Sequence, residues 1–311
     1  MAERGLSRQL RWARLFIRLS RPHFLLGGAL LYGLGAAIAH YLHYPLDGRL
    51  YALGQAMVSL IQLMAHYLNE YYDASDDLVN PQRNFLTGGS GALGPEGLPR
   101  RTALYAAIVC VTAAATVASV LLVHESVSLA TWLLLVLSFL LAYFYGAPPV
   151  RLITSGYGEL TTALLVAALV PAFAFSLLTG TLDRLLLLSS APLVALNFAM
   201  LMAFTLNDYA ADSRTGKRTL MIRLGWSTGM RLHDLAIALA VLAFAIGGFD
   251  GLPARVALGS LIALPLALAQ VWQMARIRAG FKPQWRMLTV NAIGLFVLVA
   301  YLEIVGFLLA A

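Results

Sequence analysis

Long apolar runs separated by short polar segments dominate the chain. A membrane-spanning helix needs about 20 apolar residues, and nine runs are long enough to predict spans, although the seventh is short and we expect it to borrow a turn from the polar segment before it. None of the first eight contains Asp, Glu, Lys or Arg, and the ninth contains only Glu303. The pattern therefore predicts an all-α, polytopic membrane protein with nine transmembrane helices. The predicted spans are Phe24–Leu42, Leu50–Leu68, Ala103–Val123, Val127–Tyr145, Leu160–Leu178, Leu185–Leu206, Leu235–Phe249, Val256–Met274 and Met287–Ala310.

Basic residues are distributed unevenly among the polar segments between these runs. If the N-terminus is cytoplasmic, the cytoplasmic segments hold 19 of the 22 Lys and Arg residues, and the outer loops hold only Arg49, Arg184 and Arg255. Because cytoplasmic loops are enriched in Lys and Arg, we expect a cytoplasmic N-terminus and, after an odd number of spans, a C-terminus outside the cell (inner) membrane. The net charge of +7 is then a consequence of topology and predicts no nucleic-acid partner.

Composition agrees with a membrane protein. Charged residues make up 12% of the chain, half of the roughly 25% found in soluble domains. The single cysteine, Cys110, lies in an apolar run and excludes a disulfide framework.

The first 22 residues form a separate basic segment. Six arginines, spaced 4, 3, 3, 4 and 3 residues apart between Arg4 and Arg21, follow one helix face, with apolar residues opposite. This spacing is typical of an amphipathic helix lying on anionic lipid, although a plain topogenic cluster explains the charges equally well. We divide the chain into this segment, 1–22, and a nine-span domain, 23–311.

Two acidic clusters follow the second and sixth spans. Asn69, Asp73 and Asp77 are spaced i, i+4 and i+8, and Asp208 and Asp212 are spaced i and i+4, so each set lies on one helix face. A weak internal repeat places the two faces across a common central cavity. Carboxylate oxygens with phosphate favour Mg²⁺, so we predict that these five residues bind magnesium. The alternative is a pair of solvated helix ends.

Cations and hydroxyl groups near the same span ends are suited to phosphate binding. Arg151 follows a run that contains Tyr143 and Tyr145, and Lys217 follows the second acidic cluster. Arg83 lies in the long polar segment after the first cluster, before glycines that form either a lid or an ordinary loop. A tyrosine hydroxyl and a guanidinium can share a phosphate oxygen. A purely topogenic role for these cations is the alternative.

Glu159, by contrast, begins the fifth span, where a helix N-terminus favours an acid without any further function.

Together these residues resemble the UbiA-type intramembrane aromatic prenyltransferases. That family shows Asn-x-x-x-Asp-x-x-x-Asp after the second span and Asp-x-x-x-Asp after the sixth, and both motifs are matched here. The segments 147–152, 158–160 and 216–225 look most like the 1,4-dihydroxy-2-naphthoate branch of menaquinone biosynthesis, although Phe204 stands where that branch often has Asn.

The resemblance implies a Mg²⁺-dependent enzyme that transfers a polyprenyl group from a prenyl diphosphate to an aromatic acceptor. Asp73, Asp77, Asp208 and Asp212 would be catalytic, and Asp77 is our candidate for the base that deprotonates the acceptor. Other acceptors (4-hydroxybenzoate, homogentisate or a lipid alcohol) stay open, as do chain length and oligomeric state. A cation-coupled transporter is the alternative from another class, but transporters place charged groups near the bilayer midplane rather than at span ends.

Overall fold

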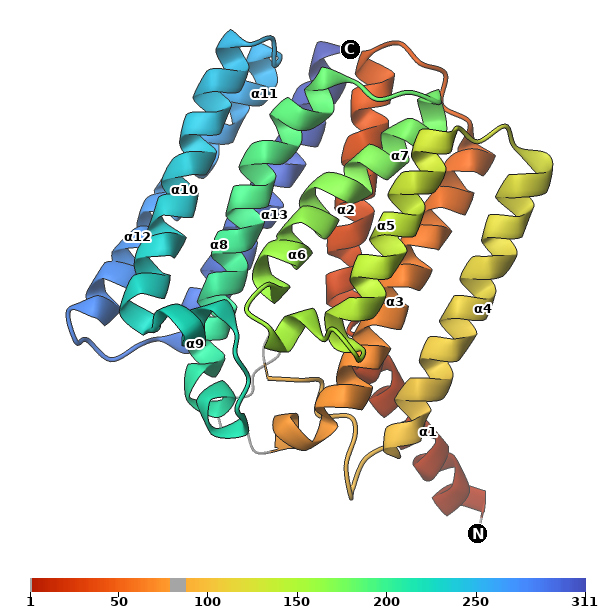
Figure 1. Cartoon of the computed structure of the whole chain (residues 1–311), viewed down its shortest axis with the longest axis vertical. Coiled ribbons are helices and arrows are strands. Elements are labelled where there is room, and N and C mark those ends of the chain that lie inside the picture. The colour runs from red at the N-terminus through yellow and green to blue at the C-terminus, as the bar shows by residue number, and fades with distance from the viewer. Residues whose placement is uncertain (1, 79–87) are drawn as a thin grey trace.

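The chain folds into a bundle of long helices (Figure 1). The computed structural model describes the backbone of residues 2–78 and 88–311, and the side chains of residues 9–75 and 88–311. Within these residues there are helices and no β-strand. The elements are α1 (Ala2–Ser20), α2 (Pro22–Tyr41), α3 (Gly48–Leu78), α4 (Arg100–His124), α5 (Leu129–Gly146), η1 (Leu152–Thr154), α6 (Gly158–Leu164), η2 (Leu165–Leu169), α7 (Val170–Thr179), α8 (Arg184–Thr215), α9 (Leu220–Leu224), α10 (Trp226–Phe249), α11 (Ala254–Gly259), η3 (Ser260–Ala263), α12 (Leu264–Arg278) and α13 (Trp285–Ala310).

The predicted spans correspond to these helices. Eight helical segments in the described part of the chain are long and apolar enough to cross a membrane. The predicted second span lies within α3, which is less apolar because it carries Gln55, Gln62 and His66. The seventh span extends back to Trp226, as expected for a run that borrows polar residues. The all-helical membrane fold is confirmed, and the count of nine spans stays a prediction.

Two spans are interrupted next to a proline. The fifth passes from α6 through the π-helical η2 to α7, just before Pro171, and the eighth passes through the 3₁₀ helix η3 just before Pro265. Proline has no N–H to donate to the carbonyl four residues earlier, which disturbs the regular helix at that turn. In η2 the disturbance lies beside the cavity described below, because Leu165 and Val166 line its wall.

The hydrophobic core has two parts. One is built mainly from α2, α8, α10, α12 and α13, and the other mainly from α3, α4, α5 and α7. They meet where α2 packs against α7. A Cβ at Gly35 would lie 2.2 Å from the Pro171 carbonyl oxygen, so only glycine permits this backbone approach. The functional cavity draws its walls from both parts of the core.

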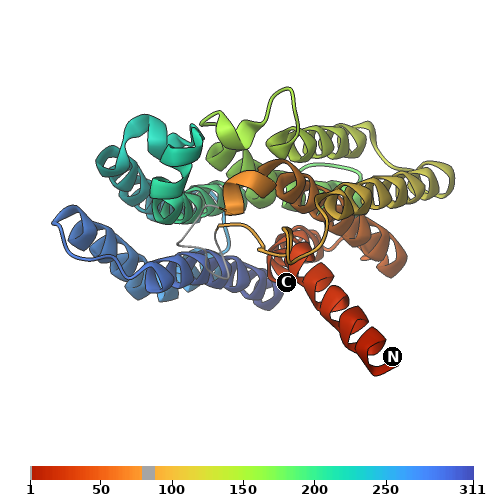
Figure 2. The ribbon, with the colours of Figure 1, turned by 90° about the horizontal axis from the view of Figure 1, so that it is seen from below.

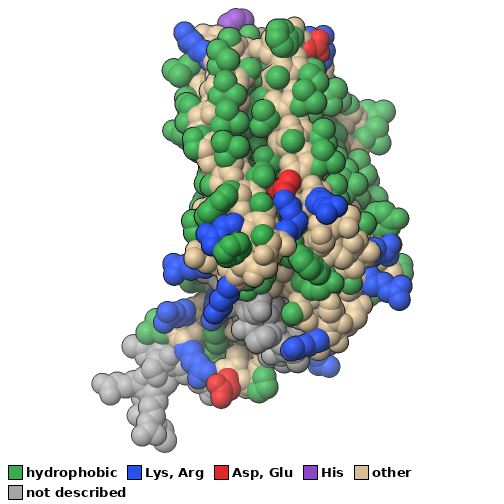
Figure 3. Space-filling view, turned by 90° about the vertical axis from the view of Figure 1, so that its left-hand side faces the viewer, with side chains coloured by type: hydrophobic (Ala, Val, Ile, Leu, Met, Phe, Trp, Pro, Cys, Tyr) green, Lys and Arg blue, Asp and Glu red, His purple; other side chains and the backbone are tan. Residues whose placement is uncertain are grey.

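The two chain ends lie at opposite ends of the bundle, and α1 projects from the lower end (Figures 1 and 2). The face seen in Figure 3 is apolar over most of its height, with Lys and Arg gathered toward the lower part. On α1, Leu10 and Ile17 are more than half exposed. The chain is therefore a multi-pass membrane protein whose basic residues collect toward one end.

Candidate active site

A large cavity lies between the two parts of the core. It has a volume of about 590 Å³, and its walls come from α2, α3, α5, α6, η2, α7, α8 and α13. Asn69 and Asp73 from the end of α3 line it together with Asp208 and Asp212 from the end of α8. The two acidic clusters, predicted to meet, therefore share one cavity.

Asp73 forms ion pairs with two cations at this cavity. Its side chain is 2% exposed, and its two carboxylate oxygens accept from different cations. Arg151 Nη2 lies 2.6 Å from Asp73 Oδ1, and Lys217 Nζ lies 2.8 Å from Asp73 Oδ2. Three segments far apart in the sequence thus meet at one carboxylate.

Local backbone geometry positions the two cations. The last residue of α5, Gly146, approaches Asn69 so closely that a Cβ would lie 3.1 Å from the Asn69 Cα atom, which brings the loop carrying Arg151 against α3. On the other side, Gly216 ends α8 in the left-handed conformation (φ 75°). The chain then turns back, and the Lys217 N–H donates to the carbonyl of Asp212.

The oxygen groups present fit a hard cation. The buried Asn69 Oδ1 has no hydrogen-bond partner among the described residues, so it is available as a ligand. In the described part of the chain no three His, Cys, Asp or Glu side chains form a complete metal site by themselves. Mg²⁺ binds one or two carboxylates and takes its other ligands from water and substrate phosphates, and the oxygens of Asn69, Asp73, Asp208 and Asp212 in this wall fit that ion.

The other predicted site residues are placed differently. Tyr145 lines the cavity, whereas Tyr143 stacks on Phe139 and packs edge-on against Phe144, and it is not among the described wall residues. Arg151 likewise reaches the site through its contact with Asp73 rather than through the wall. Arg83 and the side chain of Asp77 lie outside the described residues.

Several charged or titratable wall residues were missed at the sequence level, among them the following. Arg21 and His23, at the start of α2, line the cavity, and so does Glu159, the first acid of α6. Arg21 resembles the topogenic arginines before it, and Glu159 resembles an ordinary first-turn acid. Only the orientation of each helix in the folded protein, which brings these side chains into the cavity wall, distinguishes them from residues without a role at the site.

Glu70 connects the acidic stretch of α3 to neighbouring segments. Its carboxylate lies 2.5 Å from Arg21 Nη2, and it accepts hydrogen bonds from the Ser90 backbone N–H (2.7 Å) and hydroxyl (2.6 Å). Gly88 and Gly89, just before Ser90, line the cavity. Glu70 therefore links two parts of the cavity wall, the start of α2 and the glycine segment before Ser90, to the end of α3.

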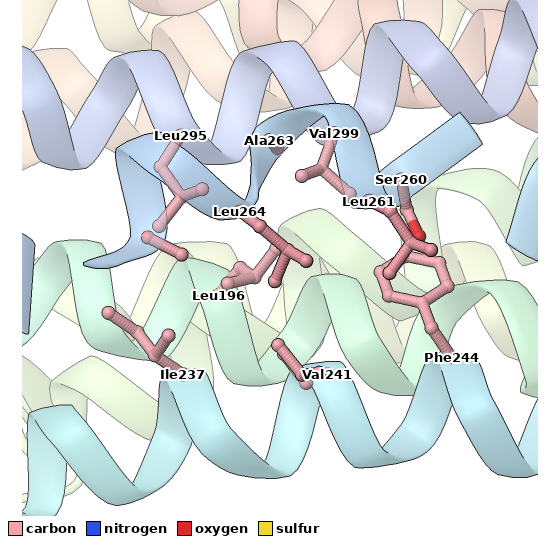
Figure 4. Close-up of a pocket in the computed structure, with 12 residues that line it drawn as sticks. Leu196, Ile237, Val241, Phe244, Ser260, Leu261, Ala263, Leu264, Leu295 and Val299 are labelled. Carbon is pink, nitrogen blue, oxygen red and sulfur yellow. The ribbon is translucent and has the colours of Figure 1, made fainter. Parts of the chain in front are cut away.

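A second hollow is far smaller. It has a volume of about 30 Å³ and lies between α8, α10, α13 and the η3–α12 segment (Figure 4). Ser260 is the one polar side chain among the described residues that line it. A site of this size and polarity cannot hold a diphosphate, so the large cavity is the candidate active site.

The arrangement of acids, cations and apolar walls agrees with a known family. Residues 29–298 match the UbiA prenyltransferase family. This chain belongs to that family. The UbiA assignment makes the protein a membrane prenyltransferase, and it confirms the resemblance inferred from the two acidic motifs.

Individual relatives agree with this assignment. The chain is 25% identical over 231 residues to a 1,4-dihydroxy-2-naphthoate octaprenyltransferase of Bacillus subtilis (strain 168), covering 74% of this chain and 70% of the relative. A UbiA homolog from Archaeoglobus fulgidus bound to GPP and Mg²⁺ is similar with a TM-score of 0.68 and 15% identity, covering 95% of this chain and 99% of that one. A digeranylgeranylglyceryl phosphate synthase structure is similar with a TM-score of 0.64 and 14% identity. The match covers 97% of this chain and 98% of that one. At these identities the solved structures show the fold alone.

Proposed function

We propose that the protein transfers a polyprenyl group from a prenyl diphosphate to a hydroxylated aromatic acceptor, with 1,4-dihydroxy-2-naphthoate as the first candidate. The observation that carries the proposal is the meeting of Asp73, Asp208, Asp212 and Lys217 at one cavity whose wall is mostly apolar. Similarity to the 1,4-dihydroxy-2-naphthoate octaprenyltransferase of Bacillus subtilis supports both the acceptor and an octaprenyl donor.

The acidic clusters hold the metal in this proposal. Asn69, Asp73, Asp208 and Asp212, with Asp77 from the same face of α3, supply the oxygens. When bound, Mg²⁺ compensates the charge of the diphosphate and makes it a better leaving group. The structurally similar Archaeoglobus fulgidus homolog binds GPP and Mg²⁺, which supports this assignment.

Arg151 and Lys217 neutralise the diphosphate. Both cations pair with Asp73. A diphosphate beside Asp73 adds phosphate oxygens within reach of the same donors, and charge-assisted hydrogen bonds to phosphate are among the stronger ones in proteins. Arg151 and Lys217, which pair with Asp73, then stabilise the negative charge that develops on the leaving diphosphate. Tyr145, in the same wall, is placed to contribute its hydroxyl.

The apolar walls protect the allylic cation and hold the prenyl tail. Phe24, Leu30, Val166 and Phe296 line the cavity, and an environment without water protects a carbocation from hydrolysis. Leu26 on α2 also lines the cavity and is 71% exposed. Because the outer surface here faces lipid, we infer that a long prenyl chain extends into the bilayer beside α2.

The membrane orientation follows the charge distribution. We propose a cytoplasmic N-terminus and a C-terminus outside the cell (inner) membrane, which places the acidic mouth of the cavity on the cytoplasmic side. The donor then enters from the bilayer, and the polar acceptor enters from the cytoplasm.

The test is a product assay with purified protein in lipid nanodiscs. Prenyl diphosphates of several lengths are combined with Mg²⁺ and a panel containing 1,4-dihydroxy-2-naphthoate, 4-hydroxybenzoate, homogentisate and a lipid alcohol. We expect mass spectrometry to detect a prenylated naphthoate product that is lost on chelation with EDTA and restored by added Mg²⁺. Absence of any prenylated aromatic product contradicts the proposal, and preference for another acceptor reassigns the substrate.

A further inference from the structure

A buried carboxylate at the start of α6 stands apart from the metal and diphosphate groups. Glu159 is 5% exposed and lines the large cavity. Its Oε1 accepts a hydrogen bond from the Leu220 backbone N–H at 3.0 Å. Its Oε2 is buried and has no hydrogen-bond partner among the described residues. Leaving a buried acceptor unpaired is costly, so this oxygen calls for an explanation.

The surroundings place Glu159 next to the diphosphate site. Leu220, whose backbone N–H donates to Glu159, comes three residues after Lys217, whose Nζ contacts Asp73. Glu159, Tyr145, Asp73 and Lys217 all line the same cavity. A ring that reacts at the diphosphate-bearing carbon has to lie in this part of the cavity.

From this geometry, and resting on the proposed function, we propose that Glu159 is the general base that takes the hydroxyl proton of the aromatic acceptor. One carboxylate oxygen is anchored by a backbone donor, which orients the group, and the other has no hydrogen-bond partner among the described residues. A general base has to lie within hydrogen-bond reach of the proton that it takes, and an oxygen without another partner can accept that hydrogen bond without giving one up.

The other acids are less suited to this step. Asp73 is held by two cations, and Asp208 and Asp212 belong to the proposed metal set. A carboxylate whose charge is compensated by a cation is a weaker proton acceptor. Glu159 pairs with neither Arg151 nor Lys217 in this structure, since each of these extends to Asp73. The proposal therefore moves the base from Asp77, our sequence-level candidate, to Glu159.

The reaction breaks one bond of the donor and forms one carbon–carbon bond. The C1–O bond of the prenyl diphosphate breaks, and its electron pair leaves with the diphosphate. The acceptor O–H gives its proton to Glu159 Oε2, its electron pair forms a ring carbonyl, and a ring carbon bonds to C1. The ring then loses the proton of that carbon to water while Glu159 returns its proton to the ring oxygen. One diphosphate and one proton are released for each C–C bond formed.

The decisive variant is Glu159→Gln. The glutamine carbonyl still accepts from the Leu220 N–H, so the link between α6 and α9 is kept while the proton acceptor is lost. We expect kcat to fall about 100-fold, with the Kd of the prenyl diphosphate, measured by titration calorimetry, within about twofold of wild type. Glu303→Gln is the matched control, because Glu303 is also fully buried but hydrogen-bonds to Ser189 away from the cavity. It should keep wild-type kcat.

A small carboxylate provides an independent readout. In Glu159→Ala, sodium formate should raise the rate saturably, and sodium chloride at the same ionic strength should not. An active wild type with Glu159→Gln within about threefold of its kcat overturns the assignment and leaves Glu159 as a link between helices. A large loss of diphosphate affinity in Glu159→Gln also overturns it. A wild type that prenylates none of the aromatic acceptors overturns the proposed function, and this inference with it.

Discussion

At the scale of single residues, the shared pairing of Asp73 is the most informative contact in the site. A sequence pattern predicts that Asp73 binds metal and that Arg151 and Lys217 bind phosphate. The structure shows that both cations contact the Asp73 carboxylate, which joins three segments of the chain. The nearly fully buried Asp73 therefore has counter-ions, and a buried charge without one is costly.

Asp73→Asn tests the role of the acid. The amide keeps the size and one acceptor oxygen but removes the negative charge. We expect kcat to fall by about 100-fold or more, because loss of a metal ligand costs at least as much as loss of its supporting partners, and Asp208→Asn should behave alike. Asp250→Asn, an exposed acid at the other end of the bundle, should leave kcat unchanged. Near-normal Mg²⁺-dependent turnover in either site variant contradicts the metal assignment.

Arg151→Ala separates the two substrates. The guanidinium contacts Asp73 and is about one-third exposed, so we expect a moderate effect, roughly a tenfold weaker Kd for the prenyl diphosphate. The KM of the acceptor should change by less than about twofold. Arg184→Ala, also a surface arginine, is the control. Equal weakening of both substrates counts against a diphosphate role.

At the scale of elements, irregular segments and buried polar contacts shape the cavity. The π-helical η2 turns Leu165 and Val166 into the wall. Glu70 ties the end of α3 to the start of α2 and to Ser90. Because Glu70 is nearly fully buried, removing its carboxylate costs more stability than breaking an exposed ion pair does.

Glu70→Ala should lower the free energy of unfolding by about 3 kcal/mol, because it leaves the partly buried Arg21 without its counter-ion. The measurement is a denaturant or thermal melt of the protein in detergent. Glu125→Ala provides the comparison, since Glu125 pairs at 3.6 Å with an Arg49 side chain that is 64% exposed, and should change stability by less than about 1 kcal/mol. Equal losses in the two variants would show that Glu70 is not a special anchor.

At the scale of the whole molecule, the bundle has an apolar body with cations collected toward one end (Figure 3). The cavity lies between the two parts of the core, and the ends of α3 and α8 both contribute acids to its wall. A site in this place gives access both to a lipid-soluble donor and to a polar acceptor. The arrangement therefore connects membrane topology to the proposed chemistry.

Topology is tested by cysteine labelling in a Cys110→Ala background. Thr181→Cys, between α7 and α8, and Gln284→Cys, between α12 and α13, both substitute exposed residues at opposite ends of the bundle. A membrane-impermeant maleimide should label Thr181→Cys in intact cells and Gln284→Cys only after permeabilisation. Reversed labelling would place the acidic mouth of the cavity outside.

The sequence by itself determined the helical membrane fold, the approximate span limits and the two acidic motifs. These features depend on local composition: an apolar run of sufficient length forms a helix in lipid whatever lies beside it, and an i, i+4 spacing places two acids on one face. Charge asymmetry between loops likewise predicts orientation without any contact being known.

Only the tertiary structure decided which of these side chains meet. The rotation of each helix about its axis brings Glu159 and Tyr145 into the cavity wall and leaves Tyr143 packed on Phe139. The shared use of Asp73 by Arg151 and Lys217 depends on segments 78 and 144 residues away. Such contacts follow from the packing of whole helices against one another, which no short stretch of sequence encodes.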